Sequence, residues 1–248
     1  MTIQKKITRK TDIRPIIQQA GALYLAGDGD GFWQVLEVEL LHHRVKFPLL
    51  EFVARELCDF VPPVEQLAIV DRLLALDYEG GYVVIGMILQ ERLAINKDEA
   101  VQKAADCIIQ GNKWYVCDII SERVFGHGLL TNFDEVVALI RPFLTHPNVW
   151  MQRAAGIATH YATKKGLAQA DVNRLFNLLL PLAASRELHV KKGVGWAFKT
   201  IAKFHPELVR PRLDEILGDT AVNPWCKNKL KIGLTMAEKR QGTRGKGS

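Results

Sequence analysis

A tryptophan and an aspartate that could act on one ligand lie four residues apart, as Trp114 and Asp118 in the run KWYVCD. Residues four apart stand on one face of a helix. A carboxylate and an indole face can both stabilise a positive charge. An aspartate in so apolar a run needs either a partner or a site to justify its burial. The alternative to a reactive site is therefore a structural ion pair, with Arg153 or Arg123.

A second candidate surface combines an indole with ammonium groups at helical spacing. It consists of Lys192, Trp196, Lys199 and Lys203. Ammonium groups are almost never buried unpaired, so we expect Trp196 to face a groove rather than the core. The helix before it continues the basic ladder with Arg153, His160 and Lys164. The other three indoles, those of Trp33, Trp150 and Trp225, are assigned to the core or to helix caps.

Signals for other enzyme chemistries are missing from the sequence. It has no P-loop, no GxGxxG run, no HExxH and no GxSxG. The four cysteines, Cys58, Cys107, Cys117 and Cys226, form neither a CxxC pair nor a Cys/His metal pattern. We therefore expect reduced thiols, no metal ion and no organic cofactor.

The elements that must position these residues are helices. Apolar residues recur at helical spacing, as in Val64, Leu67, Val70 and Leu74, and alternating strand-like runs are absent. Glycine, proline and asparagine clusters divide the chain into about a dozen helices. The sequence predicts an all-α fold.

The second half of the chain repeats itself. LIRPFLTHPNVWMQRAAGI aligns without gaps with LLLPLAASRELHVKKGVGW, which places Pro142 opposite Pro181. The offset between these prolines, about 40 residues, is close to the size of a HEAT repeat. The same offset relates Trp114, Arg153, Lys192 and Lys231, and also Asp118, Ile157 and Trp196. We expect a HEAT-like solenoid whose equivalent helices line a concave basic face.

Charge is concentrated near the end of the chain. The net charge of +6 hides an asymmetry, because 13 Lys and Arg against 5 Asp and Glu lie from Val190 onward. This favours a polyanionic partner, although a solvated charged face explains the charge equally well. We expect one domain over residues 1–238 and a disordered basic tail over 239–248. Without a signal peptide or a long apolar span, a cytoplasmic protein is expected, associated with the nucleoid through DNA binding. We also expect a monomer.

Several runs resemble the AlkD-like DNA alkylation repair enzymes. They are NVWMQRAAGI at 148–157, VKKGVGWAFKTIAK at 190–203 and HPELV at 205–209. That family has a Trp and an Asp four apart on one helix, an Arg in a W-x-Q-R-A-A run and a second Trp in a G-W run. The matching residues here are Trp114, Asp118, Arg153 and Trp196.

The resemblance implies a DNA glycosylase that excises cationic N3- or N7-alkylated purines from double-stranded DNA, with those four residues as its catalytic set. It also implies that basic residues hold phosphates around the lesion. The expected DNA contacts are Lys113, Arg153, Lys191, Lys192, Lys199, Lys203 and Lys231. Two alternatives remain: a non-catalytic repeat protein that binds damaged or unusual DNA, and a protein-interaction scaffold.

Overall fold

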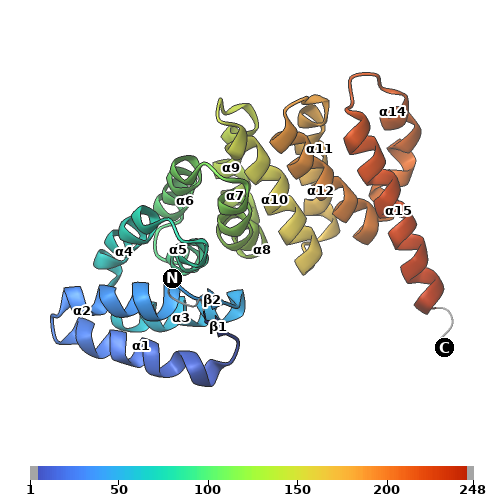
Figure 1. Ribbon diagram of the computed structural model, residues 1–248. Helices are drawn as coiled ribbons and strands as arrows, with labels where there is room; N and C mark the ends of the chain where they lie inside the picture. Colours follow the sequence, from blue (N-terminus) through green and yellow to red (C-terminus); the bar gives the residue numbers. More distant parts are fainter. Residues whose placement is uncertain (1–4, 245–248) are drawn as a thin grey trace. The chain divides into compact units, whose positions relative to one another are not determined.

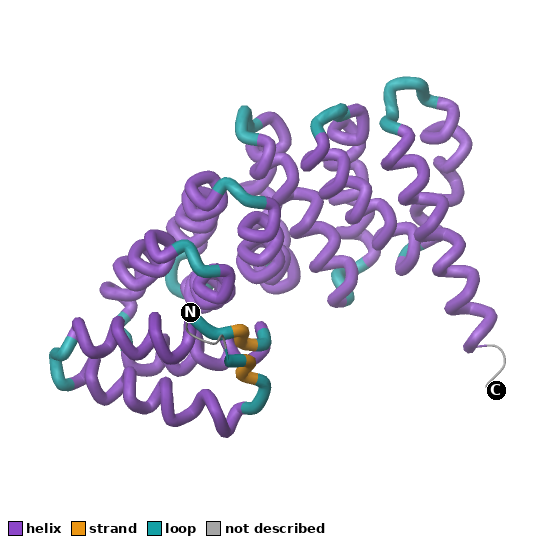
Figure 2. Tube along the Cα trace, in the orientation of Figure 1, coloured by secondary structure: helices purple, strands orange, loops and turns teal. Residues whose placement is uncertain are grey.

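The computed structural model describes residues 5–244 and is almost wholly helical (Figure 1). The predicted all-α helical-repeat fold is confirmed. The chain forms two compact units, which divide between Cys107 and Ile108, inside one helix. Short loops join successive helices throughout both units (Figure 2). The single-domain assignment over residues 1–238 remains a prediction.

The first unit contains six helices and one π-helical segment. They are α1 (Lys10–Leu25), α2 (Gly29–Gln34), the π segment (Val35–Leu41), α3 (Phe47–Phe60), α4 (Pro63–Leu76), α5 (Glu79–Arg92) and α6 (Lys97–Gly111), which crosses the boundary. Prolines in the first turns of α3 and α4 suit their helix starts, where a missing N–H costs nothing. Helix α5 packs against α3 and α4 and is buried along most of its length.

Two very short strands are the one departure from helix among the regular elements of residues 5–244. Lys6–Ile7 pairs in parallel with Arg44–Val45. The Arg44 N–H donates to the Lys5 carbonyl at 3.0 Å, and the Ile7 side chain is buried. A two-residue pairing is too short to leave the alternating pattern by which strands are predicted.

The second unit holds the candidate residues. Its elements are α7 (Trp114–Ser121), a π segment (Glu122–Gly126), α8 (His127–Thr131), α9 (Phe133–Ile140), α10 (Val149–Lys165), α11 (Gln169–Leu179), α12 (Leu188–Phe204), α13 (Pro206–Val209), α14 (Leu213–Gly218) and α15 (Pro224–Arg244). Three 3-10 segments, Arg141–Thr145, Leu180–Ala184 and Arg210–Arg212, follow α9, α11 and α13. Helices α7, α10, α12 and α15 pack side by side in chain order (Figure 1).

The predicted repeat offset holds between two of these repeats only. Pro142 and Pro181 each occupy the second position of a 3-10 segment, and the starts of α10 and α12, Val149 and Leu188, are separated by the same offset. Applied again from Leu188, this offset would start α15 at Lys227, but α15 begins earlier, at Pro224. The expectation that Ile157 lines the exposed face is wrong, because this side chain is fully buried.

Glycines allow α10 and α12 to pack closely. A Cβ added to Gly156 would lie 2.5 Å from the carbonyl carbon of Gly193, and one added to Gly193 would lie 2.9 Å from the Arg153 carbonyl oxygen. Real Cβ atoms essentially never come closer than 3.0 Å to another heavy atom. The spacing of these helices, and with it the place of Arg153, therefore depends on the absence of side chains here.

The expected tail begins inside α15. Residues 239–244, where a disordered tail was expected, continue this helix. Residues 245–248 of the expected tail lie outside the described residues. Across the described part of the chain, no helix is both long and apolar enough to cross a bilayer.

Candidate functional site

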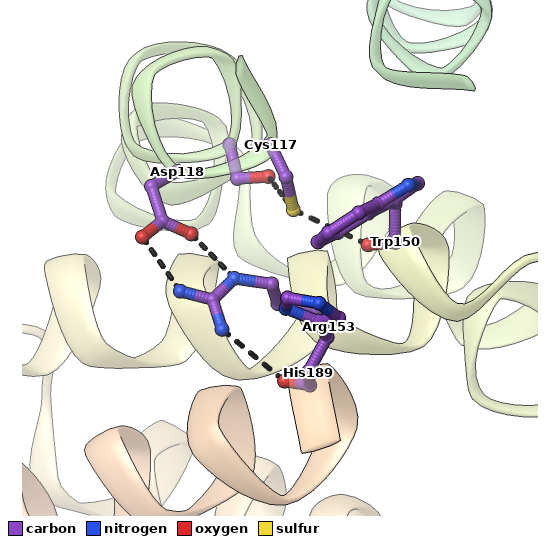
Figure 3. Close-up of polar contacts among 6 residues, drawn as sticks. Cys117, Asp118, Trp150, Arg153 and His189 are labelled. Atoms are coloured by element: carbon purple, nitrogen blue, oxygen red, sulfur yellow. Dashed lines mark hydrogen bonds and ion pairs between the residues drawn. The ribbon is translucent and has the colours of Figure 1, made fainter. Parts of the chain in front are cut away.

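Asp118 and Arg153 form a buried ion pair between α7 and α10 (Figure 3). Arg153 Nε donates to Asp118 Oδ1 and Nη2 donates to Oδ2, both at 2.7 Å. Arg153 Nη1 also donates to the His189 carbonyl at 3.2 Å, which links the pair to α12. Two parallel bonds of this kind fix both planar groups in orientation as well as in distance. Three successive repeats are thus joined through one guanidinium.

Burial and pairing act on Asp118 in opposite directions. The aspartate is 8% exposed, and this burial raises the pKa of its carboxyl group, because a charged carboxylate loses its hydration. The hydrogen bonds and the positive charge of Arg153 work against that rise. A carboxylate has about four lone-pair sites, so two hydrogen bonds leave it able to accept others. The ion pair therefore does not by itself exclude contact with a water or a substrate.

The start of α10 is held so that Arg153 points toward α7. Asn148 caps the helix by accepting the Trp150 backbone N–H at 2.9 Å. The Trp150 indole donates to Asn112 Oδ1 at 2.6 Å, and its ring lies 4.2 Å from that of His189. The Cys117 thiol donates to the Trp150 carbonyl at 3.3 Å (Figure 3). Trp150 is 8% exposed, as its assignment to the core requires.

A hollow of about 240 Å³ opens beside this pair. It is lined by Arg153, Lys192, Trp196, Lys199, Trp225 and Lys229. Four of these residues are cationic, two are indoles and none is acidic. Arg153 belongs both to the hollow and to the ion pair, so it connects the carboxylate of Asp118 with the indole of Trp196.

His160 supports Trp196 from α10. The two rings are stacked with centroids 4.3 Å apart, and His160 Nδ1 forms a hydrogen bond of 2.6 Å with Thr200 Oγ1. Burial, with the nearby charges of Lys164 and Lys199, lowers the pKa of His160 to about 4. The imidazole is therefore neutral at pH 7, and Trp196 stacks on an uncharged ring.

The remaining expected residues do not line the hollow. Trp114 is at the first position of α7 and is 57% exposed, with its ring edge against Tyr115, but it does not line the hollow. Lys113, Lys191 and Lys203 are half-buried, and Lys231 is exposed on α15. The lysines that line the hollow are Lys192, Lys199 and Lys229.

Trp225 and Lys229 line the hollow although neither is among the site residues expected from the sequence. The fixed repeat offset points from Lys192 to Lys231, but the last repeat is shorter, and the lysine in the hollow is Lys229. Trp225 was assigned to the core or to a cap, yet it is 37% exposed. A usable signal was present: Asn-x-Trp occurs at 112–114, 148–150 and 223–225, and at the last two places the Asn side chain accepts the Trp backbone N–H.

No group of three possible metal ligands occurs among residues 5–240. All four cysteines are free, and burial raises the pKa of the Cys107, Cys117 and Cys226 thiols to about 12. These thiols are thus protonated at neutral pH and are poor nucleophiles. The chemistry of the site rests on a carboxylate, a guanidinium, indoles and ammonium groups.

The fold and the site define a helical-repeat protein with a cationic, indole-lined surface next to a buried carboxylate. Residues 41–225 match the family described as DNA alkylation repair enzyme, about three quarters of the chain. The chain belongs to this family, which confirms the resemblance found in its sequence. No curated protein and no solved structure matches the chain significantly.

Proposed function

We propose that this protein is a DNA glycosylase, which hydrolyses the bond between deoxyribose and a cationic N3- or N7-alkylated purine in double-stranded DNA. The observation that carries the proposal is the position of Arg153, which holds the Asp118 carboxylate at 2.7 Å and also lines the hollow with Trp196. Family membership supports an alkylation-repair role and a DNA substrate.

The proposed chemistry matches these groups. When the bond between C1′ and the purine nitrogen breaks, its electron pair neutralises the cationic base, which leaves without needing a proton. Positive charge then grows on the sugar, where a fixed carboxylate stabilises it and orients a water. The water oxygen adds to C1′ and its proton passes to Asp118 or to solvent. The Trp196 and Trp114 indoles offer electron-rich faces to the cationic sugar and base.

The basic residues would bind the DNA backbone without reading sequence. The proposed phosphate contacts are Lys113, Lys191, Lys192, Lys199, Lys203 and Lys231, with Arg153 at the lesion. The hollow is open, which suits a ligand that remains part of a duplex.

The decisive test is release of free base from DNA that contains a cationic methylpurine, under single-turnover conditions. Asp118→Asn preserves the shape of the side chain and removes its charge. We expect it to slow base release by on the order of a hundredfold or more, as the loss of one preorganised electrostatic group often does. Its affinity for an uncleavable duplex should stay within a few fold of wild type.

One observation favours a second function, that of a non-catalytic protein that binds damaged DNA. Both Asp118 oxygens are already bound by Arg153, and the aspartate is only 8% exposed. If its role is structural, Asp118→Asn should lower the melting temperature and weaken DNA binding, and wild type should release no base. A folded Asp118→Asn protein with near-normal base release would remove the aspartate from the mechanism.

A further inference from the structure

The wall of the hollow that α15 provides has no role in the chemistry proposed above. It consists of Trp225 and Lys229, four residues apart on this helix. The Lys229 ammonium lies 4.3 Å from the centre of the Trp225 ring. The ammonium lies over one face of the indole, so this wall presents a positive charge in contact with an aromatic ring that is still 37% exposed as a residue.

Gly195 brings this wall close to Trp196. A Cβ at Gly195 would lie 2.8 Å from Trp225 Nε1 and 3.1 Å from Lys229 Cγ. The Trp225 and Lys229 side chains therefore pack directly on the α12 backbone, at the residue before Trp196. This contact closes the hollow on the side away from α10.

The hollow has an excess of positive charge. Within residues 5–240, Lys192, Lys199 and Lys229 form no ion pair. Burial lowers the pKa of Lys199, and the charges of Lys229 and Lys203 lower it further. No acidic residue lines the hollow, and the Asp118 carboxylate, which contacts Arg153, is already bound by that guanidinium. Ammonium groups gathered in this way repel one another, and a bound anion would relieve the repulsion.

The size of the hollow indicates how much of a ligand it takes. Pockets that enclose whole small molecules measure about 300–1,000 Å³, whereas this hollow measures about 240 Å³. It suits one segment of a longer anionic ligand. A nucleotide within a DNA strand combines a phosphate with an apolar sugar and base face, and the wall offers a partner for each.

We infer that Trp225 and Lys229 form a subsite for a nucleotide flanking the lesion, with its phosphate at Lys229 and its sugar or base against the Trp225 indole. The inference rests on the proposed function for the identity of the DNA. The subsite lies outside the damaged nucleotide, because Asp118 is on α7 and the wall is on α15, with α10 and α12 packed between them. Stacking on an indole and contact with a phosphate need no particular base, so the subsite is independent of sequence.

The test combines a protein change with a DNA change. Lys229→Gln is compared with wild type on uncleavable lesion-analogue duplexes that carry one neutral methylphosphonate, moved along the strand one position at a time. We expect one flanking position to weaken wild-type binding by on the order of tenfold, and Lys229→Gln to weaken binding to the unmodified duplex by a similar factor. At that position, Lys229→Gln and the methylphosphonate together should weaken binding little more than either change does alone.

Arg141→Gln is the matched control, since Arg141 is an exposed cation in the same unit that does not line the hollow. The methylphosphonate at the flanking position should weaken DNA binding by Arg141→Gln as much as it weakens binding by wild type. Trp225→Ala should weaken binding several fold without changing the dependence on salt, because it removes apolar contact rather than charge. Thermal melts of each variant identify losses caused by unfolding.

The subsite is refuted if Lys229→Gln and every methylphosphonate act independently, or if Lys229→Gln binds DNA no more weakly than Arg141→Gln. Base release by wild type in either case would leave the proposed glycosylase standing. Coupling at one flanking phosphate without any base release would refute the glycosylase and support the subsite. Failure of wild type to bind any duplex would refute both.

Discussion

Arg153 binds both carboxylate oxygens of Asp118 through two different nitrogens, each at 2.7 Å, and uses its third nitrogen for the His189 carbonyl. Three of the five guanidinium donors are therefore engaged within the protein. The charge of Arg153 is balanced by Asp118, so its first effect is to fix the carboxylate. In the proposed complex, contact with a DNA phosphate would be a second role of the Arg153 guanidinium.

Replacing the ion pair by apolar residues should separate structure from chemistry. Either Asp118→Leu or Arg153→Met alone leaves a buried charge unpaired and should lower the free energy of unfolding by about 3 to 5 kcal/mol. The double variant should recover most of that loss and still release no base. Urea unfolding and single-turnover base release measure the two effects. A stable double variant that retains base release would contradict the catalytic role.

Gly193→Ala should disturb the site through the backbone. The new methyl group would meet the Arg153 carbonyl oxygen at 2.9 Å and Arg153 Cγ at 3.0 Å, so α10 and α12 must separate. We expect a loss of about 1 to 3 kcal/mol in stability, typical of overpacking, together with slower base release. Gly218→Ala is the control, since its methyl group would meet nothing within 4 Å. Equal behaviour of the two variants would show that the close approach is unimportant.

Acid should destabilise the protein in a window set by His160. The pKa of His160 is about 4 in the folded protein, against about 6.5 in the unfolded chain. Between these values the unfolded state binds more protons, so stability falls as pH drops from about 6.5 to 4 and is insensitive to this group above that range. His160→Gln should remove the part of this loss of stability that comes from the imidazole. Equilibrium unfolding at pH 7.5 and pH 5 checks this, and parallel declines would contradict it.

Salt dependence should distinguish the cations of the site. Lys192 is exposed at the hollow and forms no ion pair with residues 5–240, so Lys192→Gln should lower the slope of log affinity against log salt by about one unit. The same is expected for Lys231→Gln if the exposed side of α15 meets DNA. Arg153→Gln should change stability more than the slope, because its charge is already compensated. Unchanged slopes for both lysine variants would indicate a merely solvated face.

The sequence carried enough information for the fold class and for the need of a partner for Asp118, but it left Arg153 and Arg123 as equal candidates. Helical periodicity and the Pro142–Pro181 match are local patterns, and local patterns survive in a single sequence. The alternative that paired Asp118 with Arg153 came from the same physical argument, that a buried carboxylate needs a partner. The lysines at helical spacing around Trp196 predicted that this indole faces a groove, and it lines the hollow.

The features that the sequence did not predict depend on geometry that a fixed offset between repeats does not describe. Repeat lengths vary, because α15 follows α12 at a shorter interval than α12 follows α10, so a fixed offset led to Lys231 instead of Lys229. Stacking of His160 on Trp196 arises from the lateral approach of two helices, which no spacing within one helix encodes.

The glycine contact between α10 and α12 also limits how this site could be altered by evolution or by engineering. With Gly156 and Gly193 facing each other, these two helices cannot move closer, and any larger residue at either position pushes them apart. A change of substrate size therefore has to come from exchanging side chains rather than from re-spacing helices. For the nucleotide beside the lesion, Trp225 is the natural place to begin, since it lines the hollow, is 37% exposed and takes no part in the ion pair. Libraries that alter how flanking DNA is held should vary this indole first and leave the glycines untouched.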